Sequence, residues 1–286
     1  MKHGVFLLAH GAPQRVEDVP EYLGYVRGGR PPSQAIVDEV THRYTAIGGA
    51  SPLTCWTMEQ AQALERLLGI PVFFGMRNWH PFITESMECV RASGIEKLAA
   101  VCLAPQYSDM SVGLYIKRTE EAGFPGQIVW AKSYHDEPLL IEAFADNLKQ
   151  VWTGQKVLFT AHSLPEKILA TGDPYDRETR ETAALVAAKA GVTDWDFAYQ
   201  SQGMTGGNWL GPTVEATLDR YAADGVKQVV LDPIGFVCDH VEVLFDVDVL
   251  FKQYAAARGI ELIRPDSLNG SPKFTAALAE VARRCL

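Results

Sequence analysis

The chain has 286 residues, of which 47% are hydrophobic and 21% are charged, and this composition is typical of a globular protein with a substantial core. Its formal net charge of −9 excludes nucleic acid as an expected partner, because phosphate binding requires a basic face. The length predicts two domains or one large one.

Short apolar runs alternate with helical patterns from the N-terminus onward. Continuous runs of this kind predict strands that are buried on both faces of a parallel sheet. The first set of predicted strands covers 4–10, 70–76, 97–105 and 127–132. The segment 11–55 is longer than a simple crossover needs, and we expect it to form a lid or a binding loop.

The rest of the chain repeats this order of elements. The second set of predicted strands covers 156–162, 195–201, 227–235 and 260–265. Each set opens with a strand, Ala-His, two further residues and Pro, so His10 and His162 occupy equivalent turns. The third strand of each set leads into a proline, in LAP and in LDP. These matches predict a duplicated half rather than a short-period repeat.

Two Rossmann-like halves of α/β class follow from this pattern. We expect each to hold a parallel four-stranded sheet, with domains at 1–132 and 133–270 and a cleft between them. The helix predicted at 271–286 is a candidate to pack on the first domain. Helical stretches at 57–69 and 181–191 both end in glycine, a usual helix stop.

The five cysteines form no CxxC pair and favour neither a disulfide framework nor a zinc site. The apolar run at the N-terminus lacks a signal-peptide pattern, so we interpret it as the first core strand. No apolar run reaches the roughly 18 residues of a spanning helix. A cytoplasmic protein is expected, with peripheral association with a membrane left open.

The two repeated histidines lie where an open α/β sheet binds its ligands, at the carboxyl ends of strands. If the halves face each other, His10 and His162 look into one cleft. An imidazole there is suited to accept a proton or to ligate a metal near neutral pH. The alternative for His162 is a turn residue that caps the next element.

Acidic residues crowd the apolar stretch GFVCDHVEVLFDVDV. A helix beginning after Asp239 places Glu242 and Asp246 one turn apart on one face. Two carboxylates that close raise one another's pKa, which favours proton transfer or binding of a hard metal ion. The alternative is an acid-rich first turn that the helix dipole favours.

Two other turns carry weaker signals. Arg77 in GMRNWHPF is suited to pair with a carboxylate and Trp79 to stack on a flat ring, although a plain βα turn also explains them. The loop 199–212 is polar, Gly-rich and aromatic, as a mobile loop near a ligand often is. Neither GxGxxG nor GxxxxGKS occurs, so the Rossmann-like pattern implies no nucleotide.

The motifs FTAHSLPEKI, YQSQ followed by WLGP, and GFVCDHVEVLFD together resemble those of the ferrochelatases. The resemblance extends over nearly the whole chain and includes YVRGGRPPS, RYTAIGGASPL, LAPQYSDMSVGLYIKR and SYHDEPLLIEAF. The chain is most similar to the coproporphyrin III ferrochelatases of Gram-positive-type heme synthesis. The resemblance implies two Rossmann-like domains of chelatase type that hold a porphyrin in the cleft and insert ferrous iron.

The resemblance also implies roles for particular residues. The active-site histidine and glutamate of the family fall on His162 and Glu242, as metal ligands or proton acceptors. The family's contacts to porphyrin, its carboxylates above all, fall on Arg27, Arg43, Tyr44, Ser51, Arg77 and Tyr115.

Three departures from the family pattern bear on the site. His10 stands where relatives usually carry tyrosine, and we expect it across the ring plane from His162. The outer metal site of the family fits Asp246 but meets Leu250 one turn later, so we expect it to be incomplete. Only Cys285 lies near the C-terminus, so we expect neither a [2Fe–2S] cluster nor another tightly bound cofactor.

The chemistry requires a free-base porphyrin to lose two N–H protons while a divalent ion loses its water. A base on one face is able to take the protons as metal enters from the other. Bending the macrocycle exposes its nitrogen lone pairs. Protoporphyrin IX as substrate, a cobalt chelatase acting on a more reduced tetrapyrrole and a non-catalytic heme carrier remain alternatives. We expect a monomer that makes at most transient contact with neighbouring enzymes of the heme pathway.

Overall fold

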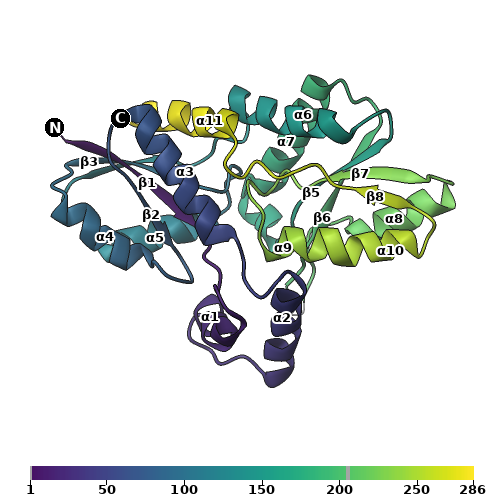
Figure 1. Ribbon diagram of the computed structural model, residues 1–286, viewed down its shortest axis with the longest axis horizontal. Helices are drawn as coiled ribbons and strands as arrows, with labels where there is room; N and C mark the ends of the chain where they lie inside the picture. The colour runs from purple at the N-terminus through teal and green to yellow at the C-terminus, as the bar shows by residue number, and fades with distance from the viewer. Residues whose placement is uncertain (1, 204–206) are drawn as a thin grey trace.

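The computed structural model describes residues 2–203 and 207–286. Its strands form two parallel four-stranded sheets that lie side by side along the longest axis (Figure 1). The first sheet, in the order β2-β1-β3-β4, comprises β1 (His3–Ala9), β2 (Val72–Met76), β3 (Lys97–Cys102) and β4 (Gln127–Ala131). The second, in the order β6-β5-β7-β8, comprises β5 (Lys156–His162), β6 (Trp195–Gln200), β7 (Gln228–Asp232) and β8 (Glu261–Ile263). The predicted α/β class with paired four-stranded sheets is confirmed.

Helices connect the strands. The first six are α1 (Val19–Val26), α2 (Gln34–Ala46), α3 (Leu53–Leu68), α4 (Ile83–Ala92), α5 (Val112–Ala122) and α6 (Pro138–Val151). They are followed by α7 (Tyr175–Ala190), α8 (Val214–Ala223), α9 (Val241–Leu244), α10 (Lys252–Ala256) and α11 (Pro272–Arg283). Two 3₁₀ turns, η1 (Val16–Asp18) and η2 (Glu166–Thr171), and a π-helical turn, η3 (Asp246–Phe251), complete the set. Gly69 and Gly191 end α3 and α7 in the left-handed conformation, at the predicted stops.

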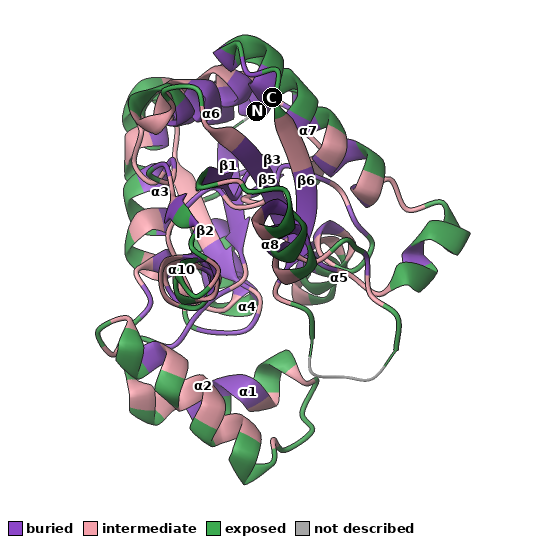
Figure 2. Cartoon of the chain, turned by 90° about the vertical axis from the view of Figure 1, so that its right-hand side faces the viewer, coloured by how far each residue is buried: buried purple, intermediate pink, exposed green. Residues whose placement is uncertain are grey.

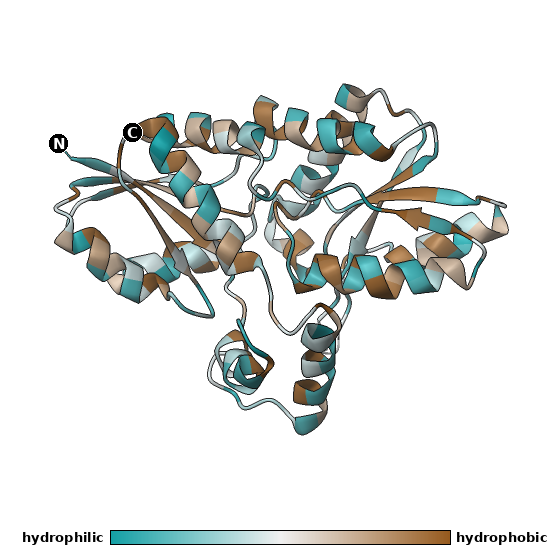
Figure 3. Ribbon diagram, viewed as in Figure 1, coloured by the Kyte–Doolittle hydropathy of each residue, from teal (hydrophilic) through white to brown (hydrophobic). Residues whose placement is uncertain are grey.

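Strand β1 shows why the apolar runs are continuous. Val5 and Leu7 face one core and Phe6 and Leu8 face another, and all four side chains are fully buried. The first core also contains α3, α6 and α11, whereas the second contains α4 and α5. Buried residues follow the strands in Figure 2, and hydrophobic residues follow them in Figure 3. A sheet covered on both faces therefore needs no polar alternation.

Three strands end two or three residues before the predicted position, and β2 begins at Val72 rather than at residue 70. The strand expected over 97–105 ends at Cys102, and that over 227–235 ends at Asp232. The strand expected over 260–265 ends at Ile263. Apolar residues continue past the last paired residue of β3 and β7, whereas the last paired residue of β8 is followed by Arg264 and Pro265. Hydrophobicity marks burial here, whereas strand ends depend on pairing.

The long insertion forms a separate unit of α1 and α2. Figure 1 shows these helices away from both sheets, below the space between them. They share a small core with Trp79, which follows β2, and this core includes Val19, Tyr22, Leu23 and Tyr44. Trp79 is 7% exposed and packs edge-on against Tyr22. The suggestion that Trp79 stacks on a ligand is wrong for this structure, because the α1–α2 unit covers its ring.

Helix α11 joins the two halves. It packs against α3 and β3 of the first sheet, and also against α6, which precedes β5. The predicted boundary between residues 132 and 133 falls in the link between β4 and α6 and stays a prediction. Among the described residues, no helix combines the length and apolar character needed to cross a membrane.

Candidate active site

The duplicated strand ends bring an imidazole and a carboxylate together in the second half. His162 is the last residue of β5, and Glu242 lies in the first turn of α9. His162 Nε2 and Glu242 Oε1 are 3.4 Å apart. The side chains are 30% and 35% exposed, so both members of the pair are partly accessible. The Nδ1 atom of His162 donates to the Ser163 carbonyl, which leaves Nε2 for Glu242.

Each partner shifts the protonation of the other. Burial lowers the pKa of His162, but the charge and hydrogen bond of Glu242 outweigh burial and raise this pKa above its ordinary value. Burial raises the pKa of Glu242, yet His162 and His240 hold it well below its ordinary value. The arrangement therefore favours an imidazolium beside a carboxylate.

His240 is a second imidazole on Glu242 to which the sequence analysis gave no role. Its Nε2 lies 3.4 Å from Glu242 Oε2, and its Nδ1 lies 3.0 Å from the Cys238 carbonyl. Glu242 therefore stands between two imidazoles, one on each carboxylate oxygen. The DHVE spacing was the available signal, because it places His240 and Glu242 on either side of one residue.

Asp246 lies one turn beyond Glu242 and is 3% exposed. It accepts a hydrogen bond from Ser201 and forms an ion pair with Arg43, whose Nη1 is 3.3 Å from Asp246 Oδ1. Burial and the charge of Glu242 raise the pKa of Asp246 to about 6. This carboxyl group thus changes charge close to neutral pH.

His10 follows β1 and reaches the same site from the first half. Its Nδ1 lies 3.2 Å from Arg77 Nη2, and its Nε2 lies 3.1 Å from the Asn78 amide. Arginine only donates, so Nδ1 is the unprotonated nitrogen of a neutral ring. Burial and Arg77 lower the pKa of His10 to about 3, and the charges of Glu242 and His162 also act on this pKa. The three predicted catalytic residues therefore share one electrostatic environment.

Aromatic side chains pack against His10 and against its neighbour Arg77. Tyr22 packs edge-on against the His10 ring at 6.4 Å, and its burial raises its pKa. The Arg77 guanidinium stacks 5.0 Å over the Tyr115 ring, and burial raises the pKa of Tyr115 to about 12. Tyr22 had no separate signal in the sequence, because its position depends on how α1 packs.

The predicted contacts to porphyrin carboxylates differ in their surroundings. Arg27 at the end of α1 has a buried Nε with no hydrogen-bond partner among the described residues. Ser51 is 5% exposed and accepts a bond from the Leu53 amide at 3.3 Å. Tyr44 is 1% exposed inside the α1–α2 unit. The Tyr44 hydroxyl is likewise buried without a hydrogen-bond partner among the described residues, so Arg27 and Tyr44 each have a polar group left for a ligand.

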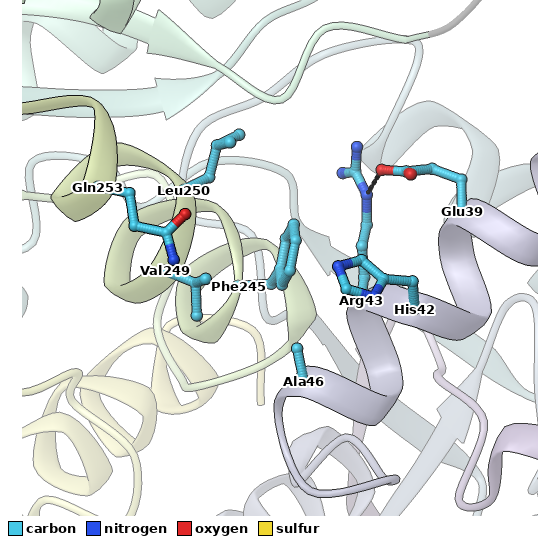
Figure 4. Close-up of a pocket in the computed structure, with 8 residues that line it drawn as sticks. All are labelled: Glu39, His42, Arg43, Ala46, Phe245, Val249, Leu250 and Gln253. Atoms are coloured by element: carbon cyan, nitrogen blue, oxygen red, sulfur yellow. Dashed lines mark hydrogen bonds and ion pairs between the residues drawn. The ribbon is translucent and has the colours of Figure 1, made fainter. Parts of the chain in front are cut away.

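Arg43 is engaged on two sides. Its Nε pairs with Glu39 at 2.9 Å, and its guanidinium lies 5.4 Å over the Phe245 ring. Figure 4 shows these residues around a groove of about 360 Å³ between α2 and the segment 245–253. A porphyrin carboxylate that binds Arg43 must therefore compete with Glu39 and Asp246.

The sequence predicts His162 and Glu242 as metal ligands. Within residues 2–203 and 207–286, no group of three or more His, Cys, Asp or Glu side chains is arranged to hold a metal ion. His162 and Glu242 supply two donors, and a porphyrin would supply nitrogen donors to a metal substrate. The absence of a cluster or tightly bound cofactor stays a prediction. Part of the predicted Gly-rich loop, at 204–206, lies outside the described residues.

Solved structures that share this arrangement of sheets include chelatases. SirB from Bacillus subtilis with Fe³⁺ aligns with a TM-score of 0.65 at 12% identity, covering 100% of this chain and 96% of that one. CbiX, described as the terminal enzyme for biosynthesis of siroheme in denitrifying bacteria, aligns with a TM-score of 0.56 at 14% identity, covering 99% of both chains. At these identities the likeness shows the fold alone, which is the chelatase fold.

Sequence comparison identifies the family within that class. The ferrochelatase family model matches residues 2–286, so the chain belongs to the ferrochelatase family. A ferrochelatase from Acidobacterium capsulatum is 44% identical, over 98% of this chain and 93% of that protein. A coproporphyrin III ferrochelatase from Halalkalibacterium halodurans is 38% identical, over 100% of this chain and 97% of that protein. The chain is a metal-chelating lyase of heme biosynthesis, with a porphyrin and iron as substrates.

Proposed function

We propose that this enzyme inserts Fe²⁺ into coproporphyrin III to give coproheme, with His162 and Glu242 on one side of the ring and His10 on the other. The observation that carries the proposal is the 3.4 Å approach of His162 Nε2 to Glu242 Oε1 at the end of β5. Nitrogen and oxygen donors of this kind suit a divalent transition metal. The Glu242 carboxylate is able to accept a proton that a porphyrin nitrogen releases, whereas the His162 imidazolium must first give up its own proton before Nε2 is able to ligate a metal or accept a proton.

The proton balance supports a division of labour between the two sides. Metal insertion releases two protons from the ring, and a carboxylate in its ionised form is able to take them one at a time and pass each to solvent. Glu242 is such a carboxylate, because its two imidazole neighbours lower its pKa. His10 stays neutral at physiological pH because burial and Arg77 lower its pKa to about 3. A neutral imidazole is able to approach metal or ring without adding positive charge.

The choice of coproporphyrin rests on cations and on relatives. Coproporphyrin has four propionates. Arg27, whose Nε has no hydrogen-bond partner among the described residues, offers one anchor for a propionate at the end of α1. Arg43 and Arg77 supply further positive charge from α2 and the turn after β2. Relatives named coproporphyrin III ferrochelatases are 38% and 36% identical over 98% or more of this chain. These observations favour a substrate with several carboxylates.

The test is an anaerobic assay of the purified protein with Fe²⁺ and either coproporphyrin III or protoporphyrin IX, followed by loss of porphyrin fluorescence. We expect a kcat/KM at least tenfold higher for coproporphyrin III. A preference for protoporphyrin IX would reject the substrate assignment and keep the chelatase chemistry. Tight heme binding without metal insertion would reject the catalytic role and support a heme carrier. Co²⁺ insertion into a more reduced tetrapyrrole, without Fe²⁺ insertion, would support a cobalt chelatase.

A further inference from the structure

The end of β6 lies beside the catalytic pair. Gln200 is the last residue of β6 and pairs with His162 across the sheet. Its side chain is 1% exposed, and the neighbouring Thr160 on β5 is fully buried. Neither side chain is needed for any step described above. A buried amide at this position must nevertheless satisfy its hydrogen bonds within the protein.

Gln200 uses both ends of its amide. Its Oε1 accepts a hydrogen bond from Thr160 Oγ1 at 2.7 Å, and its Nε2 donates to the backbone carbonyl of Glu242 at 2.9 Å. The carbonyl of Glu242 only accepts, so the NH₂ group of Gln200 must face it. The two bonds therefore fix one orientation of the amide and connect β5 to the first turn of α9.

Helix α9 needs an external support of this kind. It has four residues and runs directly into the π-helical turn η3. A helix this short is marginal by itself, so contacts outside it must set its position. A second contact comes from Ser201, whose hydroxyl donates to Asp246. Ser201 has φ 59, a left-handed conformation uncommon for a residue with a side chain.

We propose that Gln200, oriented by Thr160, is a positioning residue that holds Glu242 at its working distance from His162. Gln200 touches the backbone of Glu242 and its own strand pairs with His162, so it links the two members of the pair. The inference rests on the proposed function of that pair. Supporting groups around ligating side chains typically change activity by about 10–100-fold when they are removed.

The proposal predicts that kcat is lost while porphyrin binding is kept. In Gln200→Met the side chain keeps its size but loses both hydrogen bonds, and we expect kcat to fall about 10–100-fold. Thr160→Val leaves the Gln200 amide free to turn, and we expect a smaller fall of roughly 3–10-fold. Thr160→Ser keeps the hydroxyl, so its kcat should stay near the wild-type value. The KM for porphyrin should stay within about twofold in all three variants.

Thr57→Val is the matched control. Thr57 on α3 is fully buried, like Thr160, and its hydroxyl donates to the Leu53 carbonyl at 2.8 Å. Its loss should lower the melting temperature as Thr160→Val does, without lowering kcat. If Gln200→Met fails to fold, the comparison of Thr160→Val with Thr160→Ser decides instead.

The His162→Ala variant separates this proposal from the proposed function. If His162→Ala abolishes turnover while folded Gln200→Met and Thr160→Val keep kcat within about twofold, the positioning role is wrong and the function stands. If His162→Ala keeps full turnover, the proposed role of the pair is itself wrong. If kcat falls equally in Thr160→Val and Thr57→Val, the effect is general destabilisation, and the positioning role is rejected.

Discussion

Replacing Glu242 by glutamine removes the charge that faces His162 and leaves the shape of the site. Two unit charges 3.4 Å apart interact by about 5 kcal/mol at an effective dielectric constant of 20, and by about 1 kcal/mol in water. About a third of each side chain is exposed, so solvent screening places the interaction near 2 kcal/mol. Burial, which lowers the pKa of His162, then acts without opposition from this charge. In Glu242→Gln the pKa of His162 should therefore fall below 6.5, whereas in the wild type it lies above 6.5.

The assay is a pH titration of histidine ring signals by NMR, with His162→Ala used to assign the resonance. Glu181→Gln is the control, because Glu181 pairs with a different imidazole, that of His135, at 3.1 Å. The control should leave the titration of His162 unchanged. A His162 titration that is the same in Glu242→Gln and in the wild type would show that the carboxylate does not govern the imidazole, and the reasoning about the pair would be refuted.

Three further predictions follow from buried or unpartnered charges. Burial raises the pKa of Asp232 from 3.8 to about 7, so the folded state loses stability relative to the unfolded state as the pH rises toward 7. Between pH 5 and 8, the unfolding free energy of the wild type, measured by urea titration, should fall by about 2–3 kcal/mol more than that of Asp232→Asn. Equal losses would contradict this. Arg27→Gln should raise the KM for porphyrin by about tenfold or more, because a charge-assisted bond is lost, and an unchanged KM would remove Arg27 from the binding site. In Arg77→Met, NMR should find the pKa of His10 raised above 3 but still below 6.5, since burial persists; no rise would mean that burial alone keeps His10 neutral.

The architecture was predictable because burial on both sheet faces leaves a plain mark in the sequence. Strands β1 and β5 read as continuous apolar runs, and each leads into Ala-His. Matching runs in matching order predicted two similar sheets, and both have the strand order in which the first strand of the set lies between the second and the third. Strand ends were less accurate, because an apolar run continues wherever the chain stays buried.

The site was predictable in its composition but less so in its connections. His162 and Glu242 stand at strand and helix ends, where motif and topology agree. The Arg43–Asp246 ion pair joins residues 203 positions apart, and no local pattern marks it. The neutral state of His10 depends on Arg77 and on burial, which are properties of the folded chain. The sequence therefore predicted these residues, but not the tertiary contacts that set their charge states and partners.

The most direct measurement of the central claim is a single-turnover experiment with His162→Ala. Porphyrin binding, followed by fluorescence, is measured beside anaerobic insertion of Fe²⁺. We expect the variant to bind coproporphyrin III with a Kd within about threefold of the wild type, and to insert iron at least 100-fold more slowly. Insertion at the wild-type rate by folded His162→Ala would contradict the claim that the imidazole–carboxylate pair carries the reaction.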